Sequence, residues 1–209
     1  MSQIIVVGGS IIGSSFAYHM AMAGHASELL VIEPDPSYEF AAAPRSAGGI
    51  RLMYGLPENI EMSRYGRAVF RDFARLMDVD GAPGVFAYRQ HGYLFLASGA
   101  EAVRDVEKSY AVQSAAGVEN ELMERQAIAE RFPFLRTSDL DAGLFGPEDG
   151  SIDPHAAVVG IRRKAESLGV RYIQDSVSGL KTRGREVVVV ELASGRTLQA
   201  SAVVNVAGA

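Results

Sequence analysis

The sequence predicts an α/β fold that combines a parallel sheet, an antiparallel β-meander and a smaller α+β part. Three observations support this prediction. Short apolar runs rich in Val and Ile alternate with stretches in which apolar residues recur at helical spacing, as in sheets that are buried on both faces. A glycine-rich turn joins the first such run to the first helical stretch. Towards the other end of the chain, three strand-like runs are separated by short turn signals.

The first elements predict one βαβ unit. Residues Ile4–Val7 form a buried-strand run, and Ile11–Ala23 has apolar residues at helical spacing before Gly24, which suits a helix end. Leu29–Ile32 is a second buried-strand run and ends at Glu33. A strand, a helix and a second strand in this order make the βαβ motif, in which the two strands lie parallel.

The middle of the chain has a less regular pattern. Residues 34–56 lack clear periodicity and read as a long excursion of the kind that is more often functional than idle. The elements expected after it are a helix from Pro57 to about Met77, strands over Val85–Tyr88 and Tyr93–Leu96, and helices over Glu101–Ala116 and Glu124–Arg131. Because the two strands flank a short turn, we expect them to pair as a hairpin.

The α/β pattern resumes in the last third of the chain. The expected elements are a helix over His155–Leu168, a strand over Val170–Gln174, meander strands over Val177–Thr182, Glu186–Leu192 and Leu198–Ala200, and a buried strand over Ala202–Val206. The chain stops soon after that strand, with no further helix to cover it. We therefore expect the sequence to be truncated at its carboxyl terminus.

Composition excludes several classes of function. The net charge is −5, with no run of Lys or Arg, which argues against a nucleic-acid partner. No Cys is present, so disulfides, thiolate metal sites and a Cys nucleophile are excluded within these residues. The chain shows neither a secretory leader nor an apolar stretch of roughly 18 residues that could span a membrane. We expect a soluble, cytoplasmic protein with a small-molecule partner.

The turn after the first strand predicts dinucleotide binding. It fits the fingerprint G-x-G-x-x-G with Gly8 and Gly13 at the first and third glycine positions, while Ser10 stands at the second. Glu33 lies 20 residues after Gly13, at the end of the second strand, where a carboxylate can accept hydrogen bonds from ribose hydroxyls. A purely structural glycine turn is the alternative, but the register of strand, helix and acid favours a Rossmann-like cofactor site.

Other catalytic patterns are absent from the sequence. The four His residues are scattered without metal-ligand spacing, so no metal site is expected. No G-x-S-x-G nucleophile elbow is present, and none of the three Lys residues follows a glycine turn in the way that a P-loop requires.

Several longer stretches favour flavin over nicotinamide as the cofactor. The loop Arg45–Arg51 with the following Leu56–Ile60, the pairs Asp149-Gly150 and Asp153-Pro154, and the terminal Val203–Gly208 resemble segments of FAD-dependent oxidoreductases of the D-amino-acid oxidase superfamily. This superfamily includes sarcosine oxidases and dimethylglycine dehydrogenases. The resemblance covers nearly the whole chain and is most specific over residues 4–60.

The resemblance implies a set of cofactor contacts and one substrate contact. The residues that it assigns to FAD are Gly8, Gly9, Ser10, Ile11, Ile12, Gly13, Glu33, Pro34, Arg45, Ser46, Ala47, Gly48, Gly49, Ile50, Val177, Ala207 and Gly208. It assigns Arg51 to the carboxylate of the substrate, a role that suits guanidinium because it is always charged and binds carboxylates in a bidentate manner. The alternative for Arg51 is an ordinary ion pair or a phosphate contact.

The resemblance also implies a domain order and an activity. Residues 1–84 and 146–209 would form the FAD-binding domain and residues 85–145 the first part of a split substrate domain. The implied activity is oxidation of the C–N bond of an amine or amino acid, with O2 or another electron acceptor. Arg45 stands where dimethylglycine dehydrogenases carry the His that links flavin, so noncovalent FAD is expected. Gly48 stands in place of a basic residue that sarcosine oxidases carry beside the flavin, which favours an electron-transferring dehydrogenase as one alternative. A flavin-binding module that serves complex assembly without turnover is an alternative of another class.

Overall fold

A computed structural model describes residues 3–85, 88–184 and 186–208, which fall into two compact units. The first unit contains residues 1–48, 73–87 and 153–209, and the second contains residues 49–72 and 88–152. The expected domain boundaries at 84/85 and 145/146 differ from this division chiefly because residues 49–72 belong with the second unit. Pairing of a short strand in this segment with residues 150–151 accounts for the difference.

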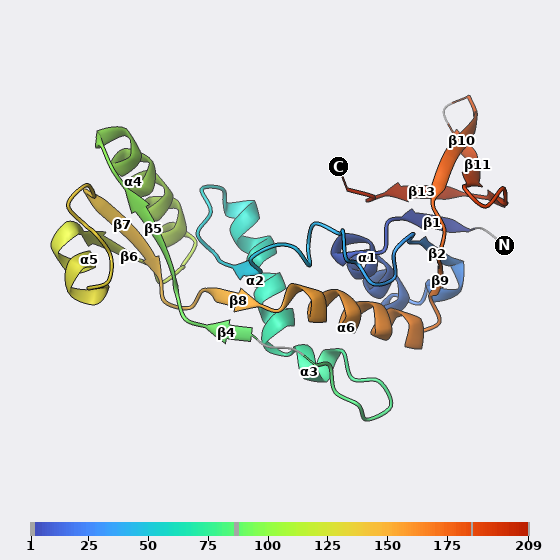
Figure 1. The fold of residues 1–209 in the computed structure, drawn as a ribbon, viewed down its shortest axis with the longest axis horizontal. Helices are drawn as coiled ribbons and strands as arrows, with labels where there is room; N and C mark the ends of the chain where they lie inside the picture. The colour runs from blue at the N-terminus through green and yellow to red at the C-terminus, as the bar shows by residue number, and fades with distance from the viewer. Residues whose placement is uncertain (1–2, 86–87, 185, 209) are drawn as a thin grey trace. The chain divides into compact units, whose positions relative to one another are not determined.

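A four-stranded parallel sheet forms the centre of the first unit (Figure 1). Its strands, in spatial order, are β13 (Ala202–Asn205), β1 (Ile4–Val7), β2 (Leu29–Ile32) and β9 (Arg171–Ile173). All four strands were predicted, and β1 and β2 have the predicted bounds. Every residue of β2 is buried, as expected for an apolar run in a sheet that is covered on both faces.

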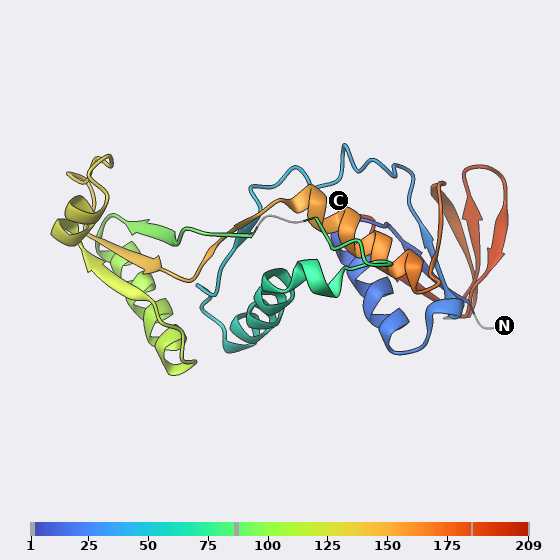
Figure 2. The same cartoon turned by 90° about the horizontal axis from the view of Figure 1, so that it is seen from below.

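Helices and a meander cover the two faces of this sheet. Helices α1 (Ile11–Met22) and α6 (Pro154–Ser167) pack against each other and lie side by side in both views (Figure 1 and Figure 2). The antiparallel meander of β10 (Val177–Arg183), β11 (Glu186–Leu192) and β12 (Thr197–Gln199) confirms the prediction. Its Val190 and Leu192 are buried against Ile5 and Ile32 of the sheet.

Two short helical segments complete the first unit. They are the 3-10 turn η1 (Ala26–Glu28) and helix α3 (Phe73–Leu76). The Phe73 ring packs on α6 at Gly160, where an added Cβ would lie 2.6 Å from two ring carbons. The sequence predicted a single helix from Pro57 to Met77, but the structure has two. Helix α2 (Pro57–Arg71) ends with Asp72 as its C-cap, and α3 begins at Phe73.

The second unit contains two three-stranded antiparallel sheets and three helices. One sheet has the order β3 (Gly49–Ile50), β8 (Gly150–Ile152), β4 (Tyr88–Gln90), and the other has the order β5 (Tyr93–Ala97), β7 (Ala142–Gly146), β6 (Glu121–Glu124). Besides α2, the helices are α4 (Ala100–Ala115) and α5 (Arg125–Arg131), close to their predicted bounds. Strands β3, β6, β7 and β8 were not predicted from the sequence.

The predicted hairpin around residues 90–92 is wrong. Strand β4 pairs with β8, whereas β5 pairs with β7, so the two strands belong to different sheets. At Gly92, with φ +80°, an added Cβ would lie 2.3 Å from the Phe145 ring, so the chain passes under that ring as it moves between sheets. Residues 86–87 of the first predicted strand lie outside the described residues, and Val85 is not part of a strand.

Within the part of the chain that the structure describes, no helix combines the length and apolar character needed to cross a membrane.

Candidate cofactor and substrate sites

The turn between β1 and α1 closes so tightly that two of its glycines have no space for a side chain. Gly8 has φ +99°, a conformation that favours glycine, and an added Cβ would lie 2.5 Å from the carbonyl oxygen of Val206. At Gly13 an added Cβ would lie 1.9 Å from the carbonyl oxygen of Gly8. The first and third glycines of the fingerprint therefore allow the turn to fold back on the start of α1.

The amino terminus of α1 offers a site for an anion. The first N–H groups of a helix have no partner within the helix, and the helix dipole makes this end positive. Ser10 occupies the N-cap position, but its side chain makes no capping hydrogen bond. In the described structure, the buried Oγ of Ser10 has no hydrogen-bond partner. A hydroxyl in this position is available to a bound phosphate group.

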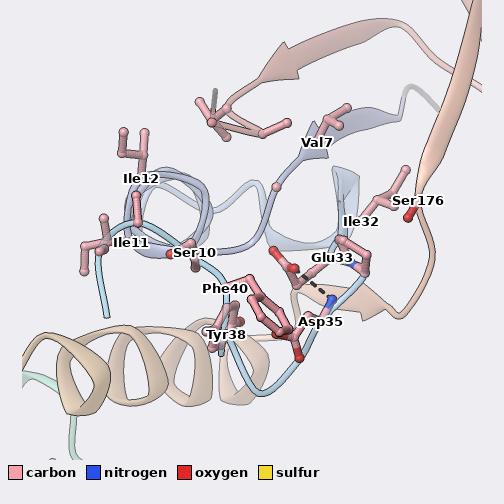
Figure 3. A pocket seen from close by; sticks show the side chains of 18 of the residues that line it. Val7, Ser10, Ile11, Ile12, Ile32, Glu33, Asp35, Tyr38, Phe40 and Ser176 are labelled. Carbon is pink, nitrogen blue, oxygen red and sulfur yellow. Dashed lines mark hydrogen bonds between the residues drawn. The ribbon is translucent and has the colours of Figure 1, made fainter. Parts of the chain in front are cut away.

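Glu33 connects the glycine turn to the segment after β2. Its Oε2 accepts a hydrogen bond from the backbone N–H of Gly9 at 2.7 Å, and its Oε1 accepts one from the N–H of Asp35 at 2.9 Å (Figure 3). Each carboxylate oxygen can accept more than one hydrogen bond. Glu33 can therefore bind ribose hydroxyls while it holds the backbone on either side.

A cavity of about 410 Å³ lies beside these groups, entirely within the first unit. Of the residues assigned to the cofactor from sequence, the cavity is lined by Gly8, Ser10, Ile11, Ile12, Glu33, Pro34, Val177, Ala207 and Gly208. Gly9 lies in the turn and Gly13 in the first turn of α1, but neither lines the cavity. Residues 45–48 belong to the same unit but do not line the cavity, whereas residues 49–51 belong to the second unit.

One wall of the cavity was not predicted from the sequence. This wall contains Asp35, Tyr38, Phe40 and residues 41–43. The Asp35 carboxylate holds the backbone of this segment in a turn, because it accepts hydrogen bonds from the N–H groups of Ser37 and Glu39 at 2.9 and 2.8 Å. Tyr38 has φ +59° and a buried side chain. The spacing of Asp35 and Ser37 is typical of an Asx turn and was the only local signal for this structure.

Arg51 lies in the second unit in an aromatic environment. Its guanidinium carbon lies 5.4 Å from the ring centres of Tyr54 and Tyr93 and 5.5 Å from that of Phe95. Its Nε is buried and has no hydrogen-bond partner among the described residues. The rings contact the guanidinium through their π-systems and leave Nε without a hydrogen-bond acceptor among the described residues.

Asp149 holds the backbone next to Arg51 and was missed as a site residue. It is buried in the turn between β7 and β8, and its Oδ1 accepts a hydrogen bond from the N–H of Leu52 at 3.0 Å. Arg67 lies 3.8 Å from the same oxygen and forms a closer ion pair, 2.9 Å, with Glu148. Burial raises the pKa of Asp149 from its ordinary 3.8 to about 6, although the Leu52 hydrogen bond and the charges of Arg67 and Arg51 act in the opposite direction.

The raised pKa of Asp149 predicts a specific dependence of stability on pH. Because the folded protein binds this proton more tightly than the unfolded chain, the stabilisation is full below pH 3.8 and is lost as the pH rises through about 6. Asp149→Asn keeps an acceptor for Leu52 but cannot ionise, so its unfolding free energy should fall less than that of the wild type over this range.

Urea unfolding of both proteins between pH 4 and pH 7 measures the difference. Asp139→Asn is a suitable control, because the hydrogen bond from Arg136 lowers the pKa of that exposed carboxyl. Because the pH-dependent stabilisation from Asp139 is gained mostly below its ordinary pKa of 3.8, the control and the wild type should give nearly parallel curves between pH 4 and pH 7. Parallel curves for the wild type and Asp149→Asn would show that the Asp149 pKa is not raised.

Comparison with known proteins decides the family. Residues 3–209 match the family described as FAD dependent oxidoreductase, or DAO. The chain belongs to this family. It is 32% identical over 195 residues to FAD-dependent oxidoreductase domain-containing protein 1 of Xenopus laevis, a match that covers 91% of this chain and 39% of that protein. It is also 28% identical over 208 residues to mitochondrial dimethylglycine dehydrogenase of Rattus norvegicus, covering 99% of this chain and 23% of that protein.

The fold of this DAO-family chain also matches solved structures. The crystal structure of L-proline dehydrogenase from P. horikoshii superposes with a TM-score of 0.83 and 26% identity, covering 100% of this chain and 53% of that one. The chain therefore spans about half of this structure and less than half of the two curated relatives. The α/β fold predicted from the sequence is confirmed.

The cavity fits the FAD on which the DAO family depends. The glycine turn is so tight that an added Cβ at Gly8 or Gly13 would clash with backbone atoms. The Ser10 hydroxyl, which has no hydrogen-bond partner among the described residues, lies at the positive end of α1, and an acid follows the second strand. Together these groups match the pyrophosphate and ribose of a dinucleotide.

Proposed function

We propose that the whole protein is an FAD-dependent oxidoreductase that oxidises the C–N bond of an amine or amino acid, such as sarcosine, glycine or a D-amino acid. The guanidinium of Arg51 carries this proposal. Its charge is bordered by three aromatic rings, and its buried Nε has no protein partner among the described residues. Such a group suits the carboxylate of an amino acid, which it can bind through two parallel hydrogen bonds.

The residues of the first unit take the cofactor roles in this proposal. Ser10 and the N–H groups at the start of α1 bind the pyrophosphate, Glu33 binds the ribose, and Val177 contacts the adenine. Residues Arg45–Ile50 and Ala207 with Gly208 approach the rest of the cofactor. FAD supplies the redox chemistry, because it takes up the hydride equivalent from the carbon next to nitrogen. The chain binds and orients the substrate so that this carbon is presented in a reactive geometry.

FAD binding in this proposal is noncovalent, and the protein is cytoplasmic. The sequence contains no Cys that could form a thioether link to flavin, and Arg45 stands in place of the linking His of dimethylglycine dehydrogenases. The final electron acceptor is O2 or another carrier. Gly48, where sarcosine oxidases have a basic residue, favours a carrier other than O2 as the second candidate.

The test is anaerobic titration of the full-length, FAD-loaded protein with sarcosine, dimethylglycine, glycine, proline and D-amino acids. We expect at least one of them to bleach the visible absorbance of the flavin. Peroxide release after oxygen is admitted would identify an oxidase, and its absence together with reduction of an artificial acceptor would identify a dehydrogenase. A flavin that none of these compounds reduces would favour a non-catalytic, assembly role.

Replacement of Glu33 tests its assignment to the ribose. Glu33→Ala removes the acceptor and also releases the N–H of Gly9. Since hydrogen bonds to charged groups contribute about 1.5 to 3 kcal/mol, the Kd for FAD should rise by roughly ten- to a hundredfold. Isothermal titration of the apoprotein with FAD measures the change.

Glu39→Ala is the matched control, because it removes an exposed Glu from the same loop that does not line the cavity. It should leave the Kd unchanged. A folded Glu33→Ala protein with wild-type affinity for FAD would refute the assignment.

A further inference from the structure

Two consecutive peptide groups of the glycine turn are each held by a side chain. The peptide between Gly8 and Gly9 donates its N–H to Glu33 at 2.7 Å. The next peptide, between Gly9 and Ser10, accepts a hydrogen bond at its carbonyl oxygen from the Oγ of Ser14 at 2.5 Å. Ser14 is fully buried in the first turns of α1. No described residue other than Glu33 and Ser14 is seen to hold these two peptides through a side chain.

The second of these contacts fixes the direction of an N–H group that borders the cavity. In a trans peptide the carbonyl oxygen and the following N–H point in opposite directions. When Ser14 holds the carbonyl of Gly9 towards the inside of α1, the N–H of Ser10 must point away from it. Ser10 lines the cavity and is the N-cap residue of α1, whose amino terminus offers the anion site. The Ser14 hydroxyl therefore sets the orientation of a potential phosphate donor.

The glycine at position 9 makes such a restraint on the following peptide necessary. Residues without a Cβ populate several backbone conformations at similar energy, so the peptide between Gly9 and Ser10 has little intrinsic preference for one orientation. If this peptide became ordered only when the cofactor binds, the loss of its conformational entropy would weaken binding. Contacts that fix the peptide beforehand should increase affinity for the cofactor.

Tyr172 fixes the Ser14 hydroxyl in turn. Its OH lies 3.1 Å from the Oγ of Ser14, although the two residues are 158 positions apart in the chain. Ser14 has one hydroxyl proton and gives it to Gly9, so Tyr172 must be the donor. Burial raises the pKa of the Tyr172 hydroxyl, which keeps it protonated. The hydrogen-bonded chain runs from Tyr172 to Ser14 to Gly9.

Arg162 of α6 holds the Tyr172 ring in place. Its guanidinium carbon lies 4.8 Å from the centre of that ring, and its Nη1 donates to the hydroxyl of Tyr38 at 3.2 Å. Its Nε donates to Glu166 at 3.1 Å, within the same helix. Because Tyr38 lines the cavity, Arg162 connects Tyr172 with the cavity wall as well as with α6.

We propose that Tyr172 is a positioning residue for the cofactor, which acts through Ser14 to orient the Gly9–Ser10 peptide towards the phosphates. Tyr172 is not among the residues that line the cavity, so it contributes without touching the ligand. This role concerns FAD binding alone and does not depend on the identity of the substrate.

The test uses Tyr172→Phe in the full-length protein, because this change removes the hydroxyl and retains the ring that packs against Arg162. The loss of one hydrogen bond should raise the Kd of the apoprotein for FAD on the order of fivefold. Ser14→Ala should raise it by at least as much. The double variant should bind no more weakly than Ser14→Ala, because both changes break the same chain of hydrogen bonds.

Thermal unfolding with and without FAD separates positioning from a purely structural role. In Tyr172→Phe the rise in Tm caused by FAD should shrink, since this rise reports the binding free energy. The matched control is Tyr88→Phe, which loses a 2.9 Å hydrogen bond to the carbonyl oxygen of Glu148 in the second unit and should keep the wild-type Kd.

Three outcomes would overturn the proposal. The first is a Tyr172→Phe protein with the wild-type Kd for FAD, whether or not its apoprotein melts at a lower temperature. The second is a double variant in which the effects of the two single changes multiply. The third is an equal loss of FAD affinity in Tyr88→Phe.

Discussion

Gly13→Ala is expected to abolish FAD binding by the folded protein. The added methyl group would lie 1.9 Å from the carbonyl oxygen of Gly8 and 3.0 Å from its carbonyl carbon, both of which are backbone atoms. Neither can move unless the turn opens, and a side-chain methyl of Val206 would also lie 3.3 Å from the added methyl group. Overpacking of this kind costs about 3 kcal/mol or more, so the Kd for FAD should rise by more than about a hundredfold.

The measurement is the FAD content of the purified protein together with the Kd of the apoprotein. Gly66→Ala is the matched control, because Gly66 lies inside α2 and no atom comes within 4 Å of its added Cβ. Ala has the higher helix propensity, so the control should keep its FAD and gain slightly in stability. Normal FAD affinity in Gly13→Ala would show that the cofactor does not need the tight turn.

The part of this site that could be predicted from the sequence is the part encoded within a short stretch of chain. A buried strand, a glycine turn and a largely apolar helix fix the backbone of β1 and α1 through local sterics alone. Glu33 could be found because it ends the very next strand. The bounds of β1 and β2 agree with the prediction for the same reason.

The rest depends on contacts between distant segments, which local periodicity does not record. Asp149 binds the backbone of Leu52 across 97 positions, and Tyr172 reaches Ser14 across 158. The predicted hairpin was wrong because β4 and β5 find their partners in β8 and β7, two strands whose short, glycine-containing sequences gave no clear period. The Tyr38 wall was missed because a non-glycine residue with positive φ has no sequence signature of its own.

Arg51→Lys is expected to lower kcat/KM for carboxylated amines by roughly ten- to a hundredfold, chiefly through a higher KM. Lys keeps the positive charge but loses the planar, two-donor geometry that binds a carboxylate, and a hydrogen bond to a charged group contributes about 1.5 to 3 kcal/mol. It would also lose the cation–π contacts of the guanidinium with Tyr54, Tyr93 and Phe95. Amines without a carboxylate should be affected far less.

Stopped-flow reduction of the flavin under anaerobic conditions separates this role from cofactor binding. The rate of reduction at saturating substrate should fall as well, because a misplaced carboxylate leaves the reacting carbon in a poorer geometry. The FAD content should remain that of the wild type. Arg136→Lys, which alters an exposed ion pair with Asp139 in the same unit, should behave as the wild type in both measurements. If Arg51→Lys instead loses FAD while the remaining holoenzyme is reduced at the normal rate, Arg51 is a cofactor residue, and the substrate carboxylate must be bound elsewhere.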